Sequence, residues 1–481
     1  MAKHKKEQEQ YLSRQLNFLE ELMDRGENVT EEYEEVKHEI ESINEQKVKG
    51  HLIRSKAKWI EDGEKCTKYF LQLESRNFKT KYIKTLKDEN KTISDHKKIL
   101  EAQEKFYGEL YTAPNDSNEE YNDVNCLFNE KSDCLSESDK QSCDIDISVE
   151  ECGKSLLALS NNKSPGSDGF TTEFYKFFWP DIRSLVFNAF NFSFESGILS
   201  NNQREAVLTL LPKPNKDLRL LKNWRPISLL NTDYKILTKL LANRLQKVIN
   251  NVVSEDQSGY IKGRFIGENI RTVLDVIEYF SQRTNPGILL FLDFEQAFDT
   301  VSWKFLFKTL DYFNFGDNFK RWISIIYNKP RATVLNNGHA TNFFSISRDI
   351  RQGCPISALL FILVAEILAI NIKMSKDITG ITINKKEIFI SQLADDTTLF
   401  VKDTKSLEKV FNILDKFHKC AGLKLNKNKT EGLILGKHNV DLSKYDIRTP
   451  DTIKYLGIII SNKINDIEIV NYNDKNHTNK K

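Results

Sequence analysis

The sequence GILLFLD, residues 287–293, decides how the chain is expected to fold, because an apolar run ends there in an acidic residue. A second apolar run, residues 388–401, is interrupted by the adjacent pair Asp395 and Asp396. Short apolar runs of this kind are typical of buried strands. Strands disfavour aspartate, so the adjacent pair predicts a turn between two strands. From these residues alone two plainer interpretations stay open: a helix-capping role for Asp293 and an ordinary surface turn at Asp395.

The three carboxyl groups also predict a cation. A carboxylate at the end of a buried strand loses hydration, which is unfavourable unless another group compensates its charge. Mg²⁺ is a hard cation that binds carboxylates, water and phosphates, and it can provide that compensation. Pairs of such ions, about 3.5–4 Å apart, promote phosphoryl-transfer reactions. Asp293, Asp395 and Asp396 are therefore candidate ligands of a metal pair.

Composition limits the class of protein. The chain has 481 residues, of which 40% are hydrophobic and 11% aromatic, and this suits about three domains or one large lobed enzyme. The formal net charge is only +2, so nucleic-acid binding has to be argued from local patches. The seven cysteines include no CxxC pair, which favours free thiols in a reducing compartment over disulfides or structural zinc.

The N-terminus shows no secretion signal. Residues 1–6 are polar and basic, unlike the start of a signal peptide. The most apolar stretch, residues 358–370, is too short to cross a bilayer and contains Glu366. We therefore expect an intracellular protein, nuclear or cytoplasmic, without a membrane segment.

The first 147 residues differ in character from the rest. Residues 1–50 are expected to form a charged helical hairpin, since they carry two apolar stripes at helical spacing. Residues 51–147 are interpreted as a basic and aromatic extension followed by an acidic linker. Within that linker, residues 115–146 are rich in Ser, Asn and acidic side chains, so we expect a mobile connector.

Residues 51–83 mix cations with aromatic side chains. Cations bind phosphates and aromatic rings stack on bases, so this mixture suits single-stranded RNA. The candidates for RNA binding are Lys58, Trp59, Lys65 and Tyr69. An amphipathic helix with a solvated basic face has the same composition, and the two interpretations stay open.

Regular structure is predicted to resume at Ser148. Ser148 and Glu151 have the spacing of a capping box, which predicts a helix that ends near Ser160. Strand-like and helical stretches then alternate as far as Ile460, without the regular repeat of a doubly wound sheet.

A series of short motifs resembles the sequence blocks of the reverse transcriptases. DFEQAFD, residues 293–299, resembles the first catalytic block of that family, and QLADD, residues 392–396, resembles the second. RQGCPIS, residues 351–357, followed by LLF at 359–361, is similar to a block between those two. An ordered series is far more specific than any single motif.

Further motifs narrow the resemblance to the non-LTR, LINE-type retrotransposon enzymes. They follow in the family's order and are KSPG with DG (163–169), LPK (211–213), NWRPIS (223–228), QSGY (257–260), GLKLN with KT (422–430) and YLG (455–457). KWI, GEK and TKYF in residues 58–70 match a segment that LINE-type proteins carry ahead of the polymerase.

The resemblance implies an α+β fold, the right-hand polymerase fold of fingers and palm, preceded by an α-helical N-terminal extension. Residues 148–285 would form the fingers and residues 286–461 the palm, and residues 462–481 are expected to be a disordered tail. Only 24 residues follow Gly457 and no endonuclease precedes the resemblance, so we expect a fragment that lacks the endonuclease and most of the thumb.

The resemblance also implies an RNA-directed DNA polymerase whose partners are an RNA template, a DNA primer and dNTPs. Asp293, Asp395 and Asp396 would be its catalytic carboxylates and would hold two Mg²⁺ ions, for which Mn²⁺ could substitute. The backbone carbonyl of Phe294 would add one oxygen ligand. Lys429 would donate a proton to the leaving pyrophosphate.

Five residues would contact the incoming nucleotide by the same resemblance: Lys213, Arg225, Phe298, Gln352 and Gly353. Lys213 and Arg225 would bind the triphosphate. Phe298 would press against the sugar and exclude a 2′-hydroxyl, although a ring at such a position is also common in an ordinary core. Gln352 would bind the nucleotide or template, and Gly353 would allow close backbone approach.

Two alternatives to the polymerase stay open. One is a catalytically inactive RNA-binding relic of such an element, and the other is a group II intron maturase, which shares the core. Leu393 departs from the family, which usually has Tyr or Phe before the Ala-Asp-Asp; we expect this to lower efficiency. Oligomeric state does not follow from the sequence.

Overall fold

The structure, a computed structural model, describes residues 82–88, 91–114, 124–128, 133–281, 283, 286–436, 440–464 and 466–471. It also describes five residues of the predicted N-terminal hairpin, all helical: Leu12, Gln15, Leu19, Glu32 and Val36. The rest of that hairpin lies outside the described residues. So do the four candidates for RNA binding, Lys58, Trp59, Lys65 and Tyr69, and the last part of the predicted tail, residues 472–481.

The chain divides into two compact units. The first contains residues 1–100, 210–224 and 335–340, and the second contains all the others. The predicted boundary between fingers and palm, after residue 285, lies inside the second unit and stays a prediction.

The first unit is built on a short antiparallel hairpin, β1 (Leu86–Asp88) with β2 (Lys91–Ile93). Lys87 N donates to Arg219 O at 2.8 Å, which ties the hairpin to the loop before η3 (Leu221–Asn223). Asn336 bonds to both backbone groups of Ile83, at 3.2 and 3.3 Å. These bonds satisfy backbone groups that three-residue strands leave open.

The second unit contains a four-stranded antiparallel sheet. Its strands, in the order β11-β12-β5-β13, are Ile390–Leu393, Asp396–Val401, Gly287–Leu292 and Glu431–Leu435. Strand β5 is an inner strand, and five of its six residues are buried. A strand covered on both faces needs a continuous apolar run rather than an alternating one. The two buried strand runs predicted from the sequence are thus confirmed.

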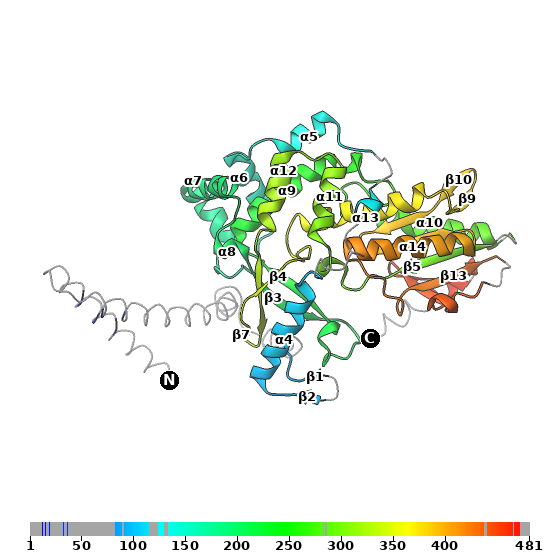
Figure 1. Cartoon of the computed structure of the whole chain (residues 1–481), viewed down its shortest axis with the longest axis horizontal. Coiled ribbons are helices and arrows are strands. Elements are labelled where there is room, and N and C mark those ends of the chain that lie inside the picture. Colours follow the sequence, from blue (N-terminus) through cyan, green and yellow to red (C-terminus); the bar gives the residue numbers. More distant parts are fainter. Residues whose placement is uncertain are drawn as a thin grey trace. The chain divides into compact units, whose positions relative to one another are not determined.

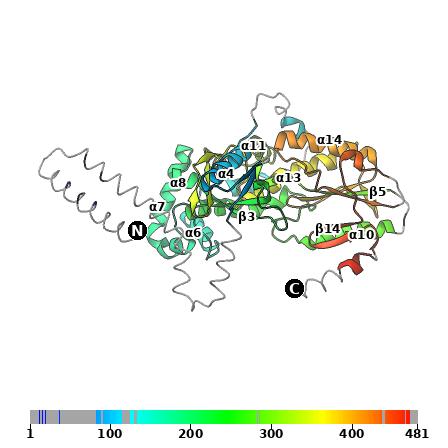
Figure 2. The same cartoon turned by 90° about the horizontal axis from the view of Figure 1, so that it is seen from below.

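Helices lie on both faces of this sheet (Figure 2). Helix α14 (Thr404–Ala421) lies on one face together with α13 (Ser357–Met374), and α10 (Ile266–Ser281) lies on the other. The core between α10 and the sheet includes Val276, Leu289 and Phe400.

Helix α13 is 18 residues long and apolar enough to cross a membrane by length and composition. Its 18-residue window is 78% buried inside the structure, where α11 and α14 pack against it. Burial on this scale is expected of the central helix of a protein core.

Two further hairpins complete this half of the second unit. Strands β9 (Ile381–Ile383) and β10 (Lys386–Ile388) pair, as do β14 (Thr452–Tyr455) and β15 (Ile458–Ser461). Residues 466–471 are helical, and Asn471 bonds to the amide and carbonyl of Ile459 at 2.9 and 2.7 Å. The prediction of a disordered tail is therefore wrong for residues 466–471, because Ile467 is buried against the core.

Three further helices pack against α9 (Figure 1). Helices α5, α6 and α7 each contact α9, and α12 contacts α5 and α7. The bounds are Glu137–Asp144 for α5, Val149–Leu157 for α6, Thr172–Ser196 for α7, Thr232–Val248 for α9 and Asp317–Ile326 for α12. The remaining helical segments are α4 (His96–Tyr111), α8 (Asn201–Arg204), α11 (Trp303–Tyr312), η2 (Val124–Leu127), η4 (Ile249–Asn251), η5 (Ala297–Asp299) and η6 (Ser443–Tyr445).

A second sheet has five strands, in the order β4-β3-β6-β7, with β8 also paired to β6. Their bounds are Glu205–Pro212 for β3, Trp224–Leu229 for β4, Arg331–Asn336 for β6, His339–Ala340 for β7 and Phe344–Ser345 for β8. Strand β3 alternates buried and partly exposed residues, as expected of a sheet with one covered face.

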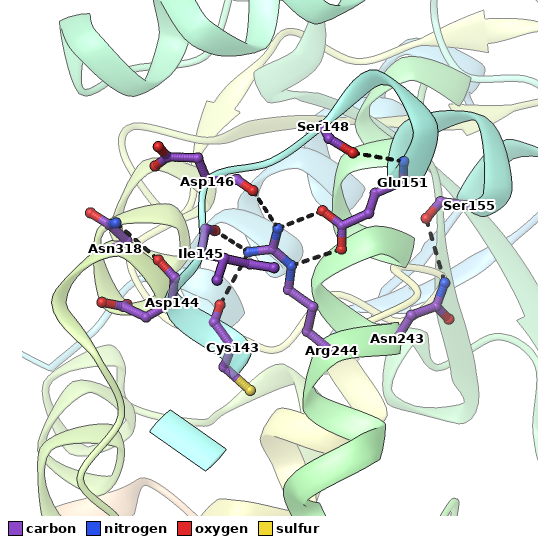
Figure 3. A network of polar contacts seen from close by, with 10 residues as sticks. All are labelled: Cys143, Asp144, Ile145, Asp146, Ser148, Glu151, Ser155, Asn243, Arg244 and Asn318. Atoms are coloured by element: carbon purple, nitrogen blue, oxygen red, sulfur yellow. Dashed lines mark hydrogen bonds and ion pairs between the residues drawn. The ribbon is translucent and has the colours of Figure 1, made fainter. Parts of the chain in front are cut away.

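Arg244 on α9 connects segments that are distant in the sequence (Figure 3). Its guanidinium, 2% exposed, donates to the carboxylate of Glu151, with a shortest distance of 2.6 Å. It also donates to the carbonyl oxygens of Cys143, Ile145 and Asp146. Arginine suits such a place because its planar group carries five donors.

This network corrects two sequence predictions. Residues 133–146 are not a mobile connector, because they include helix α5 and are fixed by Arg244 and by Asp144, which accepts from Phe319 N at 2.8 Å. The capping box at Ser148 is only half formed. Ser148 Oγ accepts from Glu151 N at 3.2 Å, but the Glu151 carboxylate binds Arg244 instead of the cap backbone.

Mixed helix and sheet confirm the α+β class. The helical N-terminal extension stays a prediction.

Candidate active site

The three predicted carboxylates, Asp293, Asp395 and Asp396, lie where the inner strands β5 and β12 of the four-stranded sheet end and begin. We call this end of the sheet the carboxylate edge. Strand β12 pairs with β5 so that Thr397 lies opposite Leu292. In an antiparallel pair the next positions outward are then Asp396 on β12 and Asp293 just past β5. Leu393 lies opposite Asp396, so Ala394 and Asp395 form the turn between β11 and β12. The predicted turn is confirmed, and Asp293, at the end of the neighbouring strand β5, lies next to it.

The turn is fixed from outside by residues 257–259. Gln257 Oε1 accepts from Ala394 N and from Gly259 N, both at 2.8 Å. Ser258 N donates to Gln392 O at 2.8 Å. Ala394 has a φ of +56°, which a residue with a side chain rarely adopts. A Cβ on Gly259 would lie 2.4 Å from Ala394 N, so only glycine allows this approach.

The edge concentrates negative charge. Desolvation by the surrounding protein, followed by the charges of Asp395 and Asp293, raises the pKa of Asp396 to about 6. Desolvation also raises the pKa of Asp395, and the charge of Asp293 adds to that effect, while Arg225 and Lys429 oppose it. Both aspartates keep solvent-exposed surface, so a cation in solution can reach them. The charge of Asp293 therefore acts on both Asp395 and Asp396, as expected of carboxyl groups that share one site.

Lys429 is the cation that contacts Asp293. Its Nζ lies 2.8 Å from Asp293 Oδ2. The two neighbouring lysines have other partners, since Lys424 pairs with Glu295 at 3.3 Å and Lys427 pairs with Asp446 at 3.2 Å. The structure thus places Lys429, and not its neighbours, at the carboxylate edge.

The backbone around Asp293 is fixed by the segment that carries Lys429. Asn426 N donates to Asp293 O at 2.7 Å, and Glu295 N donates to Lys424 O at 2.8 Å. Asn426 Nδ2 also donates to Asp293 Oδ2 at 3.3 Å. Phe294 lies between these bonds and forms a β-bridge with Leu425. Its predicted role as a carbonyl ligand stays a prediction.

Three of the five predicted nucleotide contacts come together through one loop. Gln352 O accepts from Ser228 N on β4 at 2.8 Å. Gly353 has a φ of +113°, and a Cβ there would lie 2.5 Å from Ser228 O. Ile350 N donates to Phe298 O at 2.6 Å, so Phe298 is tied to the same loop. The close approach predicted for Gly353 therefore occurs against the chain's own β4.

The two predicted triphosphate contacts differ in placement. Arg225 is an exposed residue of β4, close enough to Asp395 for its charge to oppose the rise in the pKa of that carboxyl group. Lys213 belongs to the first unit, where its Nζ donates to Lys222 O at 2.7 Å. Its role at the triphosphate stays a prediction.

The chemistry of the donor set suits a divalent cation. Carboxylate oxygens are the ligands that Mg²⁺ prefers, and a divalent charge would offset both the desolvation and the neighbouring negative charges that raise the pKa of Asp395 and Asp396. Within the described residues, no three His, Cys, Asp or Glu side chains stand together as an assembled metal group. Asp293 is instead balanced by Lys429 in this structure.

Sequence reasoning missed several residues of this site. Gln257 and Asn426 belong to motifs used for the resemblance, yet no role was predicted for either. Thr430, whose Oγ1 accepts from Asp293 N at 3.4 Å, and Asp299, which accepts from Gln352 Nε2 at 3.2 Å, were also missed. Polar residues inside the motif blocks were the available indication.

Comparison with known proteins agrees with this geometry. The family model "Reverse transcriptase (RNA-dependent DNA polymerase)" matches residues 211–460, just over half of the chain. The chain is 31% identical over 442 residues to the "Transposon TX1 uncharacterized 149 kDa protein" of Xenopus laevis, covering 89% of this chain and 33% of that protein.

Two further relatives come from insects. The chain is 28% identical to a Pol polyprotein from a type-1 retrotransposable element R2 of Popillia japonica, over 46% of this chain and 31% of the relative. It is 23% identical to the "RNA-directed DNA polymerase from mobile element jockey" of Drosophila melanogaster, over 66% and 35% respectively. The chain spans about a third of the length of these relatives. It belongs to the reverse transcriptase (RNA-dependent DNA polymerase) family, among the proteins of non-LTR, LINE-type retrotransposons.

Proposed function

We propose that this chain is the catalytic core of an RNA-directed DNA polymerase. It adds deoxynucleotides from dNTPs to the 3′-hydroxyl of a DNA primer paired with an RNA template. The observation that carries the proposal is the juxtaposition of Asp293 with Asp395 and Asp396 at one sheet edge, beside Lys429.

The carboxylates would hold the metal ions. Asp293 and Asp395 would be the main ligands, Asp396 would support them, and the Phe294 carbonyl would add an oxygen. Two Mg²⁺ ions, or Mn²⁺ in their place, would lower the pKa of the primer hydroxyl and neutralise the triphosphate. Asp293 would exchange its contact with Lys429 for a metal contact.

The other side chains would position substrate and protons. The primer hydroxyl would lose its proton to solvent, and its oxygen would bond to the α-phosphorus as the bond to pyrophosphate breaks. Lys429, released from Asp293, would give a proton to the leaving pyrophosphate. Arg225 and Lys213 would bind the triphosphate, and Phe298 would exclude a 2′-hydroxyl. Most of the rate acceleration would come from positioning and charge stabilisation, as in other phosphoryl transfers.

The proposal includes an intracellular site of action, nuclear or cytoplasmic. The seven cysteines, odd in number and without a CxxC pair, support a reducing compartment.

A catalytically inactive RNA-binding chain is the second candidate. The ion pair between Lys429 and Asp293 favours it, because this contact engages the first predicted metal ligand.

Primer extension separates the two candidates. The purified chain, an RNA template, a DNA primer, dNTPs and Mg²⁺ should give extended primer, and Asp293→Ala or excess chelator should abolish it. Template binding without extension by the unmodified chain would support the inactive candidate.

A further inference from the structure

Asp299 is a buried carboxylate without a role in the scheme above. It ends η5 and is 4% exposed. Tyr111 Oη donates to its Oδ1 at 3.1 Å, and Gln352 Nε2 donates to its Oδ2 at 3.2 Å. The carboxylate therefore connects helix α4 to the loop that carries a predicted nucleotide contact.

Tyr111 keeps its phenol proton, and so remains a donor to Asp299, at any ordinary pH. Burial, followed by the charge of Asp299, raises the pKa of Tyr111 well above its usual value, so the phenol keeps its proton. Tyr111 is 2% exposed and Phe344 stacks on it at 6.4 Å, which fixes the ring. One oxygen of Asp299 is thus always occupied by a donor, and the second oxygen faces Gln352.

The hydrogen bond to Asp299 fixes the orientation of the Gln352 side-chain amide. The amide nitrogen of Gln352 is the donor to Asp299 Oδ2, so the amide oxygen faces away from Asp299. The backbone of Gln352 is fixed separately, by the bond from Ser228 N to Gln352 O at 2.8 Å. Because the backbone and the amide nitrogen of Gln352 are both held, the amide group cannot rotate freely, and its oxygen points in a fixed direction as a hydrogen-bond acceptor.

We propose that Asp299, held by Tyr111, is a positioning residue that presents the Gln352 amide oxygen to a donor group, a hydroxyl or an amine, of the incoming nucleotide. The inference rests on the proposed polymerase function. Asp299 does not touch the substrate; it acts only through Gln352.

A double-mutant cycle on dNTP incorporation tests this coupling. Asp299→Asn places an amide nitrogen next to one of the two donors, Tyr111 Oη or Gln352 Nε2. The Gln352 amide then has to rotate or lose this hydrogen bond, and KM for the dNTP should rise about tenfold. The value of kcat should change less. In a Gln352→Ala background the same Asp299→Asn change should leave KM within about twofold, because the group that it orients is gone. An equal effect in both backgrounds would overturn the proposal.

An isosteric exchange provides the rescue. Gln352→Glu alone sets two carboxylates against each other and should raise KM. When Gln352→Glu is combined with Asp299→Asn, the amide nitrogen at position 299 donates to one carboxylate oxygen at position 352. The other carboxylate oxygen at position 352 still faces the nucleotide. The double variant should recover most of the affinity lost by either single change, and failure to recover any would contradict the proposal.

Asp349→Asn is the matched control. Asp349 is also a buried aspartate of this region, 2% exposed, and burial raises its pKa to about 8, so it is mostly neutral already. Its replacement by a neutral amide should leave KM unchanged. A tenfold rise in this control would show that any change in the buried cluster perturbs nucleotide binding, and would overturn a specific role for Asp299.

Equilibrium binding keeps this inference separate from the proposed function. The affinity of a labelled dNTP for the protein–template–primer complex is measured with Ca²⁺, without bond formation. A chain that binds dNTP in this way and shows the predicted coupling supports the inference even if extension is undetectable. A chain that neither binds dNTP nor extends a primer overturns both proposals, whereas extension with additive variants overturns this inference alone.

Discussion

Lys429 Nζ lies 2.8 Å from Asp293 Oδ2, so the amine predicted to protonate the leaving group pairs with the first of the predicted catalytic carboxylates. In that position the lysine neutralises part of a strongly acidic edge. A divalent ion that binds Asp293 would release the amine next to the triphosphate. Without metal, Lys429 would neutralise Asp293. With metal bound, Asp293 would be a metal ligand and Lys429 the proton donor.

Lys429→Ala should lower the rate of single-nucleotide incorporation by about 100-fold, the usual range for loss of a proton donor. Lys427→Ala is the control, because Lys427 pairs with Asp446 and not with the carboxylate edge. Rapid-quench measurements of one addition give both rates. Equal rates for the two variants would remove Lys429 from the chemistry.

Phe298→Ala should lower the preference for dNTPs over ribonucleotides by about tenfold or more, because the ring that would meet a 2′-hydroxyl is gone. Phe298 stacks on Phe361, with ring centroids 4.4 Å apart, so its position is fixed. Phe298→Leu, which keeps bulk, should show a smaller change. Competition between the two nucleotides at one template position measures the ratio, and an unchanged ratio would count against the gate.

Asp396→Asn should stabilise the metal-free chain at neutral pH. The pKa of Asp396 is raised from 3.8 to about 6 by desolvation and by Asp395 and Asp293. The folded state therefore holds this proton more tightly than the unfolded state, and stability falls as pH rises between those two values. Thermal unfolding in chelator should show a higher Tm for the variant at neutral pH and little difference well below pH 4.

In the unmodified chain, bound metal ions should offset the destabilisation that ionised Asp396 causes at neutral pH. Mg²⁺ or Mn²⁺ should raise Tm at neutral pH and much less at acid pH, where protons compete for the carboxyls. Asp451→Asn, at an exposed aspartate outside the edge, is the control and should respond like the unmodified chain. A Tm that is indifferent to the metal at every pH would argue against cation binding.

Arg244→Ala should destabilise the second unit by about 3 kcal/mol or more, because Glu151 and three carbonyl groups lose their partner in a buried place. Arg244→Lys should recover little, since an ammonium cannot supply the same planar set of donors. Denaturant unfolding gives the free energies. A loss below 1 kcal/mol for both variants would contradict the importance of this network.

The strands and the turn were predictable because their causes are local. The apolar run before Asp293 and the interrupted run around Asp395 indicate buried strands and a turn within a few residues. The family resemblance then assigned their aspartates to one metal site. The predicted connector was wrong for residues 133–146 because what orders them is Arg244, about a hundred positions later. Composition cannot show a partner at that distance.

The site shows the same limit. The resemblance named Gln352 as a nucleotide contact, but the orientation of its amide depends on Asp299 and Tyr111, which lie on separate segments. The resemblance named Lys429 as the proton donor, and the ion pairs of Lys424, Lys427 and Lys429 are what separates it from its two neighbours. Side-chain partners across the fold decide such details, and motif spacing does not contain them.

The most direct test is Mg²⁺-dependent extension of a DNA primer on an RNA template by the unmodified chain and by Asp395→Asn, with template binding measured in parallel. We predict extension by the unmodified chain, none by the variant, and template affinities that agree within about twofold. Equal extension by both chains, or binding without extension by either, would contradict a polymerase built on these carboxylates.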